Sequence, residues 1–187
     1  MESTNMHWLL ALCVGIGLAA TCGFRVFVPL LGLSIAQHVG YLTVSPGFGW
    51  MGTWPAIIAF GIATLVEISA YYIPWLDNLL DTIATPIAVL AGILVATSVL
   101  GELPPFLRYS LGVIVGGGAA GLVQGSSVVV RGTSTASTGG LGNPLVATFE
   151  LVTSIIGTII SIVLPIVAIV LVAVVMFIIF RRMAFPR

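Results

Sequence analysis

Charged residues are scarce in this chain, and lysine is absent. Of the 187 residues, six are basic and six are acidic, so 6% are charged and the formal net charge is zero. A soluble domain carries charge on about a quarter of its residues, because its surface must be solvated. The lack of a basic surplus also argues against a nucleic-acid partner and against a polybasic patch for lipid headgroups. The composition therefore excludes an ordinary soluble protein.

Motifs of enzymes and of metal sites are equally scarce. The chain offers no Ser/His/Asp set, no cluster of His and Glu ligands, and no Gly-rich phosphate loop with a lysine. We therefore expect no enzymatic activity, no cofactor and no metal site. His7 and His38 stand singly near the two ends of the first apolar segment. Cys13 and Cys22 lie inside that segment and are expected to pack as small residues, without forming a disulfide.

Apolar segments fill most of the sequence. Hydrophobic residues make up 59% of the chain and the mean hydropathy is +1.21, which is typical of an integral membrane protein. A helix that crosses the hydrocarbon core needs about 20 apolar residues. Six segments approach or exceed that length: roughly 8–39, 54–73, 82–100, 106–130, 144–163 and 164–181. We predict an all-α membrane protein with about six transmembrane helices, in which residues 1–187 form one transmembrane domain.

The two halves of the chain resemble each other in sequence. A shift of 100 residues aligns 17–36 with 117–136, and seven of the twenty positions are identical. With a shorter shift, the segment around Glu67 aligns with the segment around Glu150. Each half would then contain a span rich in small residues, a span with one buried glutamate, and a span that opens on Pro-Ile.

Three spans in each half would give the halves opposite orientations in the membrane, as in many secondary transporters. We therefore predict two inverted three-helix repeats, at about 8–100 and 106–181, each with a broken first helix. The N-terminal MESTNMHW lacks the basic region of a signal peptide, so the first span is expected to stay in the mature protein. Three arginines follow the last span and predict a cytoplasmic C-terminus: Arg181, Arg182 and Arg187. Six spans would place the N-terminus on the same side.

Several charged residues lie at membrane depth. A charge at the centre of a helix costs about 2.5–3.5 kcal/mol on insertion scales, so such residues usually pair inside the bundle or line a wet cavity. Arg25 lies in CGFRVFVP, where Gly and Pro are expected to break the helix. Arg131 opens a polar stretch that we expect to be unwound or re-entrant and to line a cavity. Ser134 and Asn143 would offer neutral ligands there.

Glu67 and Glu150 balance the two arginines in charge. The four residues could form buried ion pairs that hold the halves together, or one carboxylate could bind a cation or carry a proton. Asp77 follows Pro74 and either begins an interfacial helix or joins the buried site. The candidate residues for binding an ion or a substrate are therefore Glu67, Glu150, Arg25, Arg131, Asp77, Ser134 and Asn143.

A family resemblance covers nearly the whole chain. It rests on three motifs: GFRVFVPLLGLSIAQHVG, LVEISAYYIPWLDNLLDTIATPIAVLAGILVA and RGTSTASTGGLGNPLVATFELV. Together these are similar to a family of small bacterial integral membrane proteins that carries only a domain-of-unknown-function label. The resemblance implies the membrane fold and no substrate. That family often has a charged residue where this chain has Tyr71 and Tyr72, so the resemblance does not support a site at those two positions.

Three classes of function remain open. We favour a small transporter or channel for an ion or small solute, with a site near the midplane where the repeats meet. The alternative is a structural or lipid-interacting scaffold, which the many Gly and Ala residues fit equally well. A lipid enzyme is disfavoured for want of catalytic motifs. The expected location is a bacterial cytoplasmic (inner) membrane, the expected partners are lipids and a small ion or solute of either charge, and a homo-oligomer could shield the polar centre.

Overall fold

The computed structural model describes the backbone of residues 2–184 and, within it, the side chains of 7–73, 76, 82–178 and 181. Every regular element in this part of the chain is a helix, which confirms the predicted all-α class. In chain order the elements are α1 (Glu2–Cys22), α2 (Phe27–His38), the 3-10 helix η1 (Pro46–Gly52), α3 (Trp54–Ala70), α4 (Pro74–Val99), α5 (Pro105–Leu111), the π-helix η2 (Gly112–Gly117), α6 (Gly118–Thr138), α7 (Asn143–Val163) and α8 (Pro165–Ala184).

Three stretches of helix among the described residues are long and apolar enough to cross a membrane. They are Thr82–Val99 in α4, the 34-residue run Pro105–Thr138, and α7. A fourth span results if η1 and α3, which bend by 66° at their junction, are counted together. The run Pro105–Thr138 is about 50 Å long at 1.5 Å per residue, so part of it must lie outside a hydrocarbon core of about 30 Å. The chain is a membrane protein by this measure, but six spans are not confirmed.

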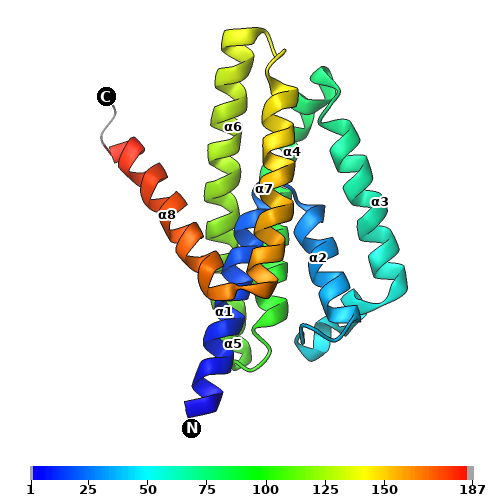
Figure 1. Cartoon of the computed structure of the whole chain (residues 1–187), viewed down its shortest axis with the longest axis vertical. Coiled ribbons are helices and arrows are strands. Elements are labelled where there is room, and N and C mark those ends of the chain that lie inside the picture. Colours follow the sequence, from blue (N-terminus) through cyan, green and yellow to red (C-terminus); the bar gives the residue numbers. More distant parts are fainter. Residues whose placement is uncertain (1, 185–187) are drawn as a thin grey trace.

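The first predicted span is a helical hairpin. α1 rises from the N-terminus to the middle of the molecule, and α2 returns toward the end from which α1 came (Figure 1). At the turn, Gly23 is required because a Cβ atom would lie 2.6 Å from the carbonyl oxygen of Ala120. Pro29 stands in the first turn of α2, where its missing N–H costs no hydrogen bond. The break predicted in CGFRVFVP is confirmed, and the chain reverses direction there.

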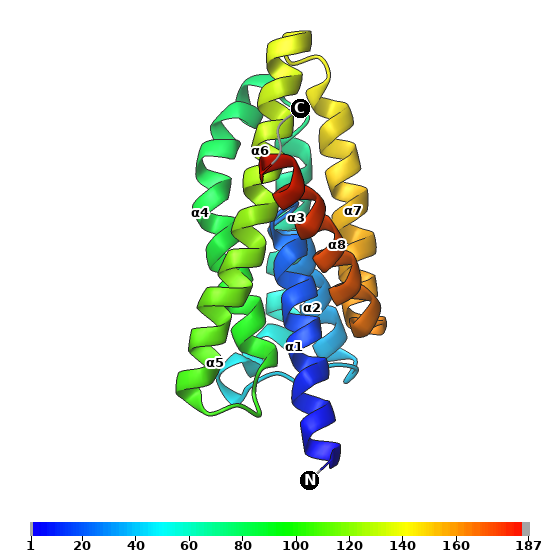
Figure 2. The ribbon, with the colours of Figure 1, turned by 90° about the vertical axis from the view of Figure 1, so that its left-hand side faces the viewer.

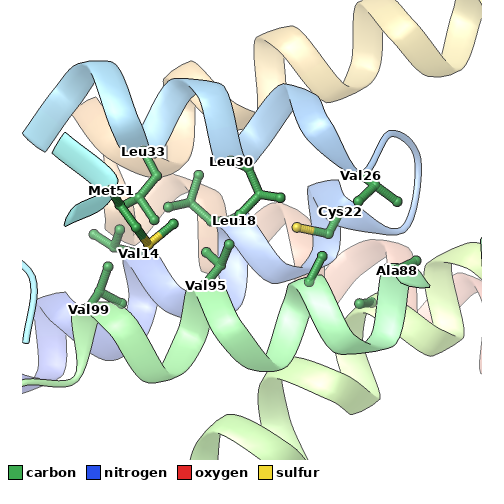
Figure 3. Packing of buried hydrophobic residues seen from close by; sticks show 12 residues of the cluster. Val14, Leu18, Cys22, Val26, Leu30, Leu33, Met51, Ala88, Val95 and Val99 are labelled. Carbon is green, nitrogen blue, oxygen red and sulfur yellow. The ribbon is translucent and has the colours of Figure 1, made fainter. Parts of the chain in front are cut away.

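The main apolar core lies between α1, α2 and α4 (Figure 3). Val14, Leu18 and Cys22 follow one another at intervals of four residues and so share one face of α1. Val95 and Val99 of α4 belong to the same cluster, and all five side chains are at most 5% exposed. Lipid tails are as apolar as these side chains, so the helices associate here through close packing and gain little from hydrophobic burial.

Small residues bring α4 against the helix formed by η2 and α6. A Cβ atom at Gly92 would lie 2.6 Å from the Cβ of Ala120, and one at Gly116 would lie 2.6 Å from the Cβ of Ala96. Close backbone approach of this kind is a common way to hold membrane helices together. It fixes the position of α6, which carries part of the site described below.

The prediction of an unwound or re-entrant segment after Arg131 is wrong. α6 continues without interruption from Gly118 to Thr138, and Arg131 lies inside it. The serine and threonine hydroxyls in its last turns donate to backbone carbonyls one turn earlier, which allows a helix of this polar composition. The helix ends at Gly139, whose φ of 64° is the left-handed conformation that glycine adopts readily.

The inverted repeat is only partly reflected in the arrangement of the helices. α3 and α7 run in opposite directions, and so do α4 and α8 (Figures 1 and 2). The first elements differ, because one half begins with the α1–α2 hairpin and the other with a continuous helix that contains a π-helical segment. A six-span inverted repeat is therefore not confirmed. α8 leaves the bundle at an angle after contacting α1 and α7 (Figure 1).

Candidate functional site

Arg25 is buried at the turn of the α1–α2 hairpin. Its side chain is 1% exposed, and it extends toward α7. Its Nη2 atom donates a hydrogen bond to the carbonyl oxygen of Ala147 at 2.8 Å and lies 3.6 Å from Oε2 of Glu150. The break in the helix thus places a permanent cation inside the bundle, beside a carboxylate of another helix.

Glu150 is held mainly by α6. Arg131 donates from Nε to Oε1 at 3.1 Å and from Nη2 to Oε2, while the hydroxyl of Ser127 donates to Oε1. Ser127 and Arg131 are four residues apart and therefore lie on the same face of α6. Arg131 and Glu150 are 2% and 3% exposed. This ion pair is closed to solvent, and both oxygens of the carboxylate accept hydrogen bonds.

Tyr71 lies against both arginines. The Cζ atom of Arg25 is 3.8 Å from the centre of the tyrosine ring, and that of Arg131 is 4.2 Å from it. Tyr71 directly follows the last residue of α3 and is 5% exposed. A desolvated cation over an aromatic face is stabilised by about 2 kcal/mol. The ring therefore joins α3 to α6 and to the hairpin at the point where two positive charges approach each other.

Glu67 occupies the same region with different partners. Its Oε1 and Oε2 atoms accept the backbone N–H groups of Val26 and Phe27 at 2.8 and 3.1 Å. The first N–H groups of a helix lack partners within the helix, and the helix dipole favours a negative charge beside them. Glu67 therefore caps α2 from α3 and does not form one of the symmetric arginine pairs that the repeat suggested.

The guanidinium of Arg25 keeps donors that bind nothing in the structure. Its Nε and Nη1 atoms are buried and have no hydrogen-bond partner. An arginine has five N–H bonds, and three of them belong to these two atoms. Buried polar groups are nearly always paired, so three unpaired N–H bonds on one charged side chain are exceptional.

The other predicted residues lie away from this centre. Asn143 is 2% exposed and exchanges hydrogen bonds with Thr135 where α6 and α7 are joined, and half-buried Ser134 lies in the same region. Asn143 is seven residues before Glu150 on α7, so about 10 Å separates them along the helix axis. The side chain of Asp77 lies outside the described residues, and its prediction stays untested. The structure thus brings together four of the predicted residues: Arg25, Glu67, Arg131 and Glu150.

A polar stripe continues from Glu150 along the buried face of α7. Ser154, Thr158 and Ser161 are at most 4% exposed and follow at intervals of four, four and three residues. Ser154 donates to the carbonyl oxygen of Thr21 at 3.3 Å, and the Thr158 hydroxyl lies 3.4 Å from that of Thr21. This stripe is not among the residues predicted from the sequence, although its spacing of three and four residues is the pattern of one helix face.

Metal chemistry finds no support in the described part of the chain. No three His, Cys, Asp or Glu side chains there lie close enough together to hold a metal ion. Cys13 and Cys22 are free thiols, and Cys22 is buried in the apolar core. The side chains of the charged cluster offer ionic and hydrogen-bonding contacts.

Residues 12–184 match a family model described as a domain of unknown function, DUF4126. The match covers most of the chain. The protein belongs to the DUF4126 family. This confirms the resemblance to a family of unknown function that the three motifs indicated. The family description names no substrate. Neither a curated protein nor a solved structure matches the chain. The function of this DUF4126 protein therefore follows only from its own residues.

Proposed function

We propose that this protein is a small transporter or channel for an ion or small solute, with its site at the charged cluster formed by Arg25, Glu67, Arg131 and Glu150. The single observation that carries the proposal is the burial of Arg25 at a helix break with unpaired N–H donors. Intramembrane charges are costly and commonly mark the path of a transported species. Interrupted helices that meet buried charges are a common arrangement in secondary transporters.

The polar stripe on α7 supports a route away from this cluster. It runs from Glu150 to Ser161, and Ser161 lines a mainly apolar pocket of about 400 Å³ together with residues of α1, α6 and α8. A buried row of hydroxyls that begins at a charged cluster offers successive hydrogen-bonding groups to a small polar species. The proposal implies no enzymatic activity, and lipids are the expected surroundings.

A scaffold function is the second candidate, and the saturation of Glu150 favours it. Both of its oxygens accept hydrogen bonds from α6, as expected of a charge that only holds helices together. Close contacts between glycine and alanine at α4 and α6 point the same way. The scaffold reading leaves the free donors of Arg25 unexplained, so we rank it below transport.

The proposal extends to location and orientation. We propose a location in a bacterial cytoplasmic (inner) membrane. We also propose a cytoplasmic C-terminus, since exposed Arg181 lies near the end of α8 and two more arginines follow it in sequence. The hairpin revises the expectation for the N-terminus. A segment that enters the membrane and returns adds no crossing, and α1 begins at the end of the bundle opposite to the end of α8 (Figure 1). The fold therefore favours termini on opposite sides.

Flux into proteoliposomes tests the transport proposal. The panel would contain protons, monovalent and divalent cations, and small anions, each measured with and without the reconstituted full-length protein. We expect saturable flux of at least one species, reduced at least about tenfold in Glu67→Gln and Glu150→Gln and retained in Arg108→Gln. Arg108 is a suitable control because it lies in α5, at the far end of the long helical run from Arg131. A folded protein that carries no species on the panel would leave the scaffold function as the better account.

A further inference from the structure

We propose that the species bound at the charged cluster is a small monovalent anion, with Arg25 as its principal ligand. This inference rests on the proposed transport function and names its substrate class, which the balanced charge of the sequence leaves open. Halides, nitrate and short carboxylates share the required chemistry, namely one negative charge and compact acceptor atoms.

Each carboxylate oxygen of the cluster already accepts at least one hydrogen bond. Glu150 receives hydrogen bonds on both oxygens from Arg131 and one from Ser127. Each oxygen of Glu67 accepts a backbone N–H group at the start of α2. A bound cation would need oxygen ligands, and it would have to compete with these donors for both carboxylates.

The atoms of the cluster that have no hydrogen-bond partner at all are donors. Three N–H bonds of Arg25, on Nε and Nη1, have no partner although the side chain is 1% exposed. The Tyr71 ring covers the guanidinium at 3.8 Å, and the N–H bonds of a guanidinium lie in its plane. Approach is therefore left to the edge of the group, where an acceptor meets N–H bonds directly. Only an electron-rich ligand can satisfy them.

The electrostatic surroundings of Arg25 also favour an anion. A second guanidinium, that of Arg131, has its Cζ atom 4.2 Å from the centre of the same tyrosine ring. The N-terminus of α2, which bears the positive end of the helix dipole, already holds an anionic group of this chain, the carboxylate of Glu67. Two guanidinium groups and a helix N-terminus meet at this place, and the two carboxylates that balance their charge already accept hydrogen bonds, so the side chain left with unpaired polar atoms is a positively charged one. The near-complete burial of Arg25 limits the ligand to a small one.

Anion-dependent stability of the purified full-length protein in detergent provides a test that needs no transport. The unfolding midpoint would be followed by tryptophan fluorescence while sodium chloride, sodium formate or sodium acetate replaces sodium gluconate at constant ionic strength. A ligand that binds only the folded state raises the midpoint saturably. We expect a rise of several degrees for at least one of these anions and none when potassium replaces sodium at constant anion concentration.

Two substitutions at Arg25 make the test specific. Arg25→Lys keeps the charge but removes Nε and Nη1, so the anion concentration at half saturation should increase at least about tenfold. Arg25→Gln should abolish the rise, and Arg108→Gln should leave it unchanged. If Arg25→Gln does not fold, Arg25→Lys decides alone. Absence of any anion-dependent rise in the unmodified protein, or an identical rise in Arg25→Lys, would overturn the inference.

Binding and flux then separate the two proposals. Anion binding that depends on Arg25, without flux in proteoliposomes, would refute transport and leave the anion site standing. Saturable flux of a cation or of protons, without an anion-dependent rise in the midpoint, would refute the anion site and leave transport standing. Flux of an anion that falls in parallel with binding in Arg25→Lys would support both.

Discussion

Glu67 caps the backbone at Val26. Its Oε1 atom accepts the N–H of Val26 at 2.8 Å, so the end of α3 is fixed to the turn at which the first hairpin reverses. The second oxygen takes the next N–H along the chain at 3.1 Å. A carboxylate from a distant helix thus replaces the local side chain that usually caps an α-helix. The same contact places Tyr71, four residues later, against the buried arginines.

Removal of this cap should destabilise the protein measurably. Glu67→Gln keeps one acceptor oxygen and loses the charge, so we expect a loss of about 1 kcal/mol in the free energy of unfolding, and about 2 kcal/mol for Glu67→Ala. Unfolding of the purified protein in detergent would measure both. Glu102→Gln is the matched control, because Glu102 is exposed, and it should change stability by less than about 0.5 kcal/mol. Equal free energies of unfolding for all three variants would show that the cap makes no measurable contribution to stability.

Loss of Glu150 should have a larger effect. Glu150→Gln leaves buried Arg131 without the carboxylate that it binds through two nitrogen atoms, and breaking such a pair costs about 3–5 kcal/mol. Replacing both residues, as in Arg131→Met with Glu150→Leu, removes the unpaired charge of Arg131 and should cost less than Glu150→Gln alone, while Arg25 loses its carboxylate neighbour at 3.6 Å in both variants. A double-mutant cycle measures the coupling. A cost below about 1 kcal/mol for Glu150→Gln would contradict a closed ion pair at this position.

The ring of Tyr71 should matter through its aromatic face. Tyr71→Phe keeps the ring and Tyr71→Leu removes it, so the difference between the two variants isolates the contact with the guanidinium groups of Arg25 and Arg131. We expect Tyr71→Leu to be about 1–2 kcal/mol less stable than Tyr71→Phe. The measurement is the unfolding midpoint with both variants in the same detergent. If the two variants are equally stable, the arginines do not depend on the ring.

The sequence predicts the class of this fold and one of its irregularities. Scarce charge and long apolar segments indicate a membrane protein, and Gly23 with Pro29 locates the first helix break. Glycine and proline indicate where a helix breaks, but they do not indicate the direction in which the next helix runs. The reversal between α1 and α2 therefore could not be predicted. The polar residues after Arg131 suggested a second break. They remain helical because their hydroxyls donate to backbone carbonyls one turn earlier. The amino-acid composition alone does not show whether such residues stay helical in this way or unwind.

The charged residues of the site could be predicted from the sequence, but the groups that each of them binds could not. Arg25, Arg131 and Glu150 meet because buried charges in a membrane must pair. Glu67 binds backbone N–H groups, and no pattern of side chains reveals such a partner. Tyr71 was not among the predicted site residues, because the chain departs from the family pattern at that position, whereas the structure places its ring beside both arginines.

The direction of the chain through the membrane can be tested at Ser134 and at the N-terminus. Ser134 lies near the end of α6 that is joined to α7, at the end of the bundle toward which α8 extends, while α1 begins at the opposite end (Figures 1 and 2). In a chain with Cys13→Ala and Cys22→Ala, we expect Ser134→Cys to react with an impermeant maleimide from the cytoplasmic side only. An N-terminal reporter should then report the opposite side.

Ser34→Cys is the matched control for this labelling. Ser34 is fully buried and donates to the carbonyl oxygen of Met51, so a cysteine there should be protected from both sides. A reporter that places both termini in the cytoplasm would contradict the re-entrant hairpin and restore the even number of crossings predicted from the sequence. Labelling of Ser34→Cys from either side would instead show that water reaches α2 inside the hairpin. A permeation path allows such access, and a closed scaffold does not.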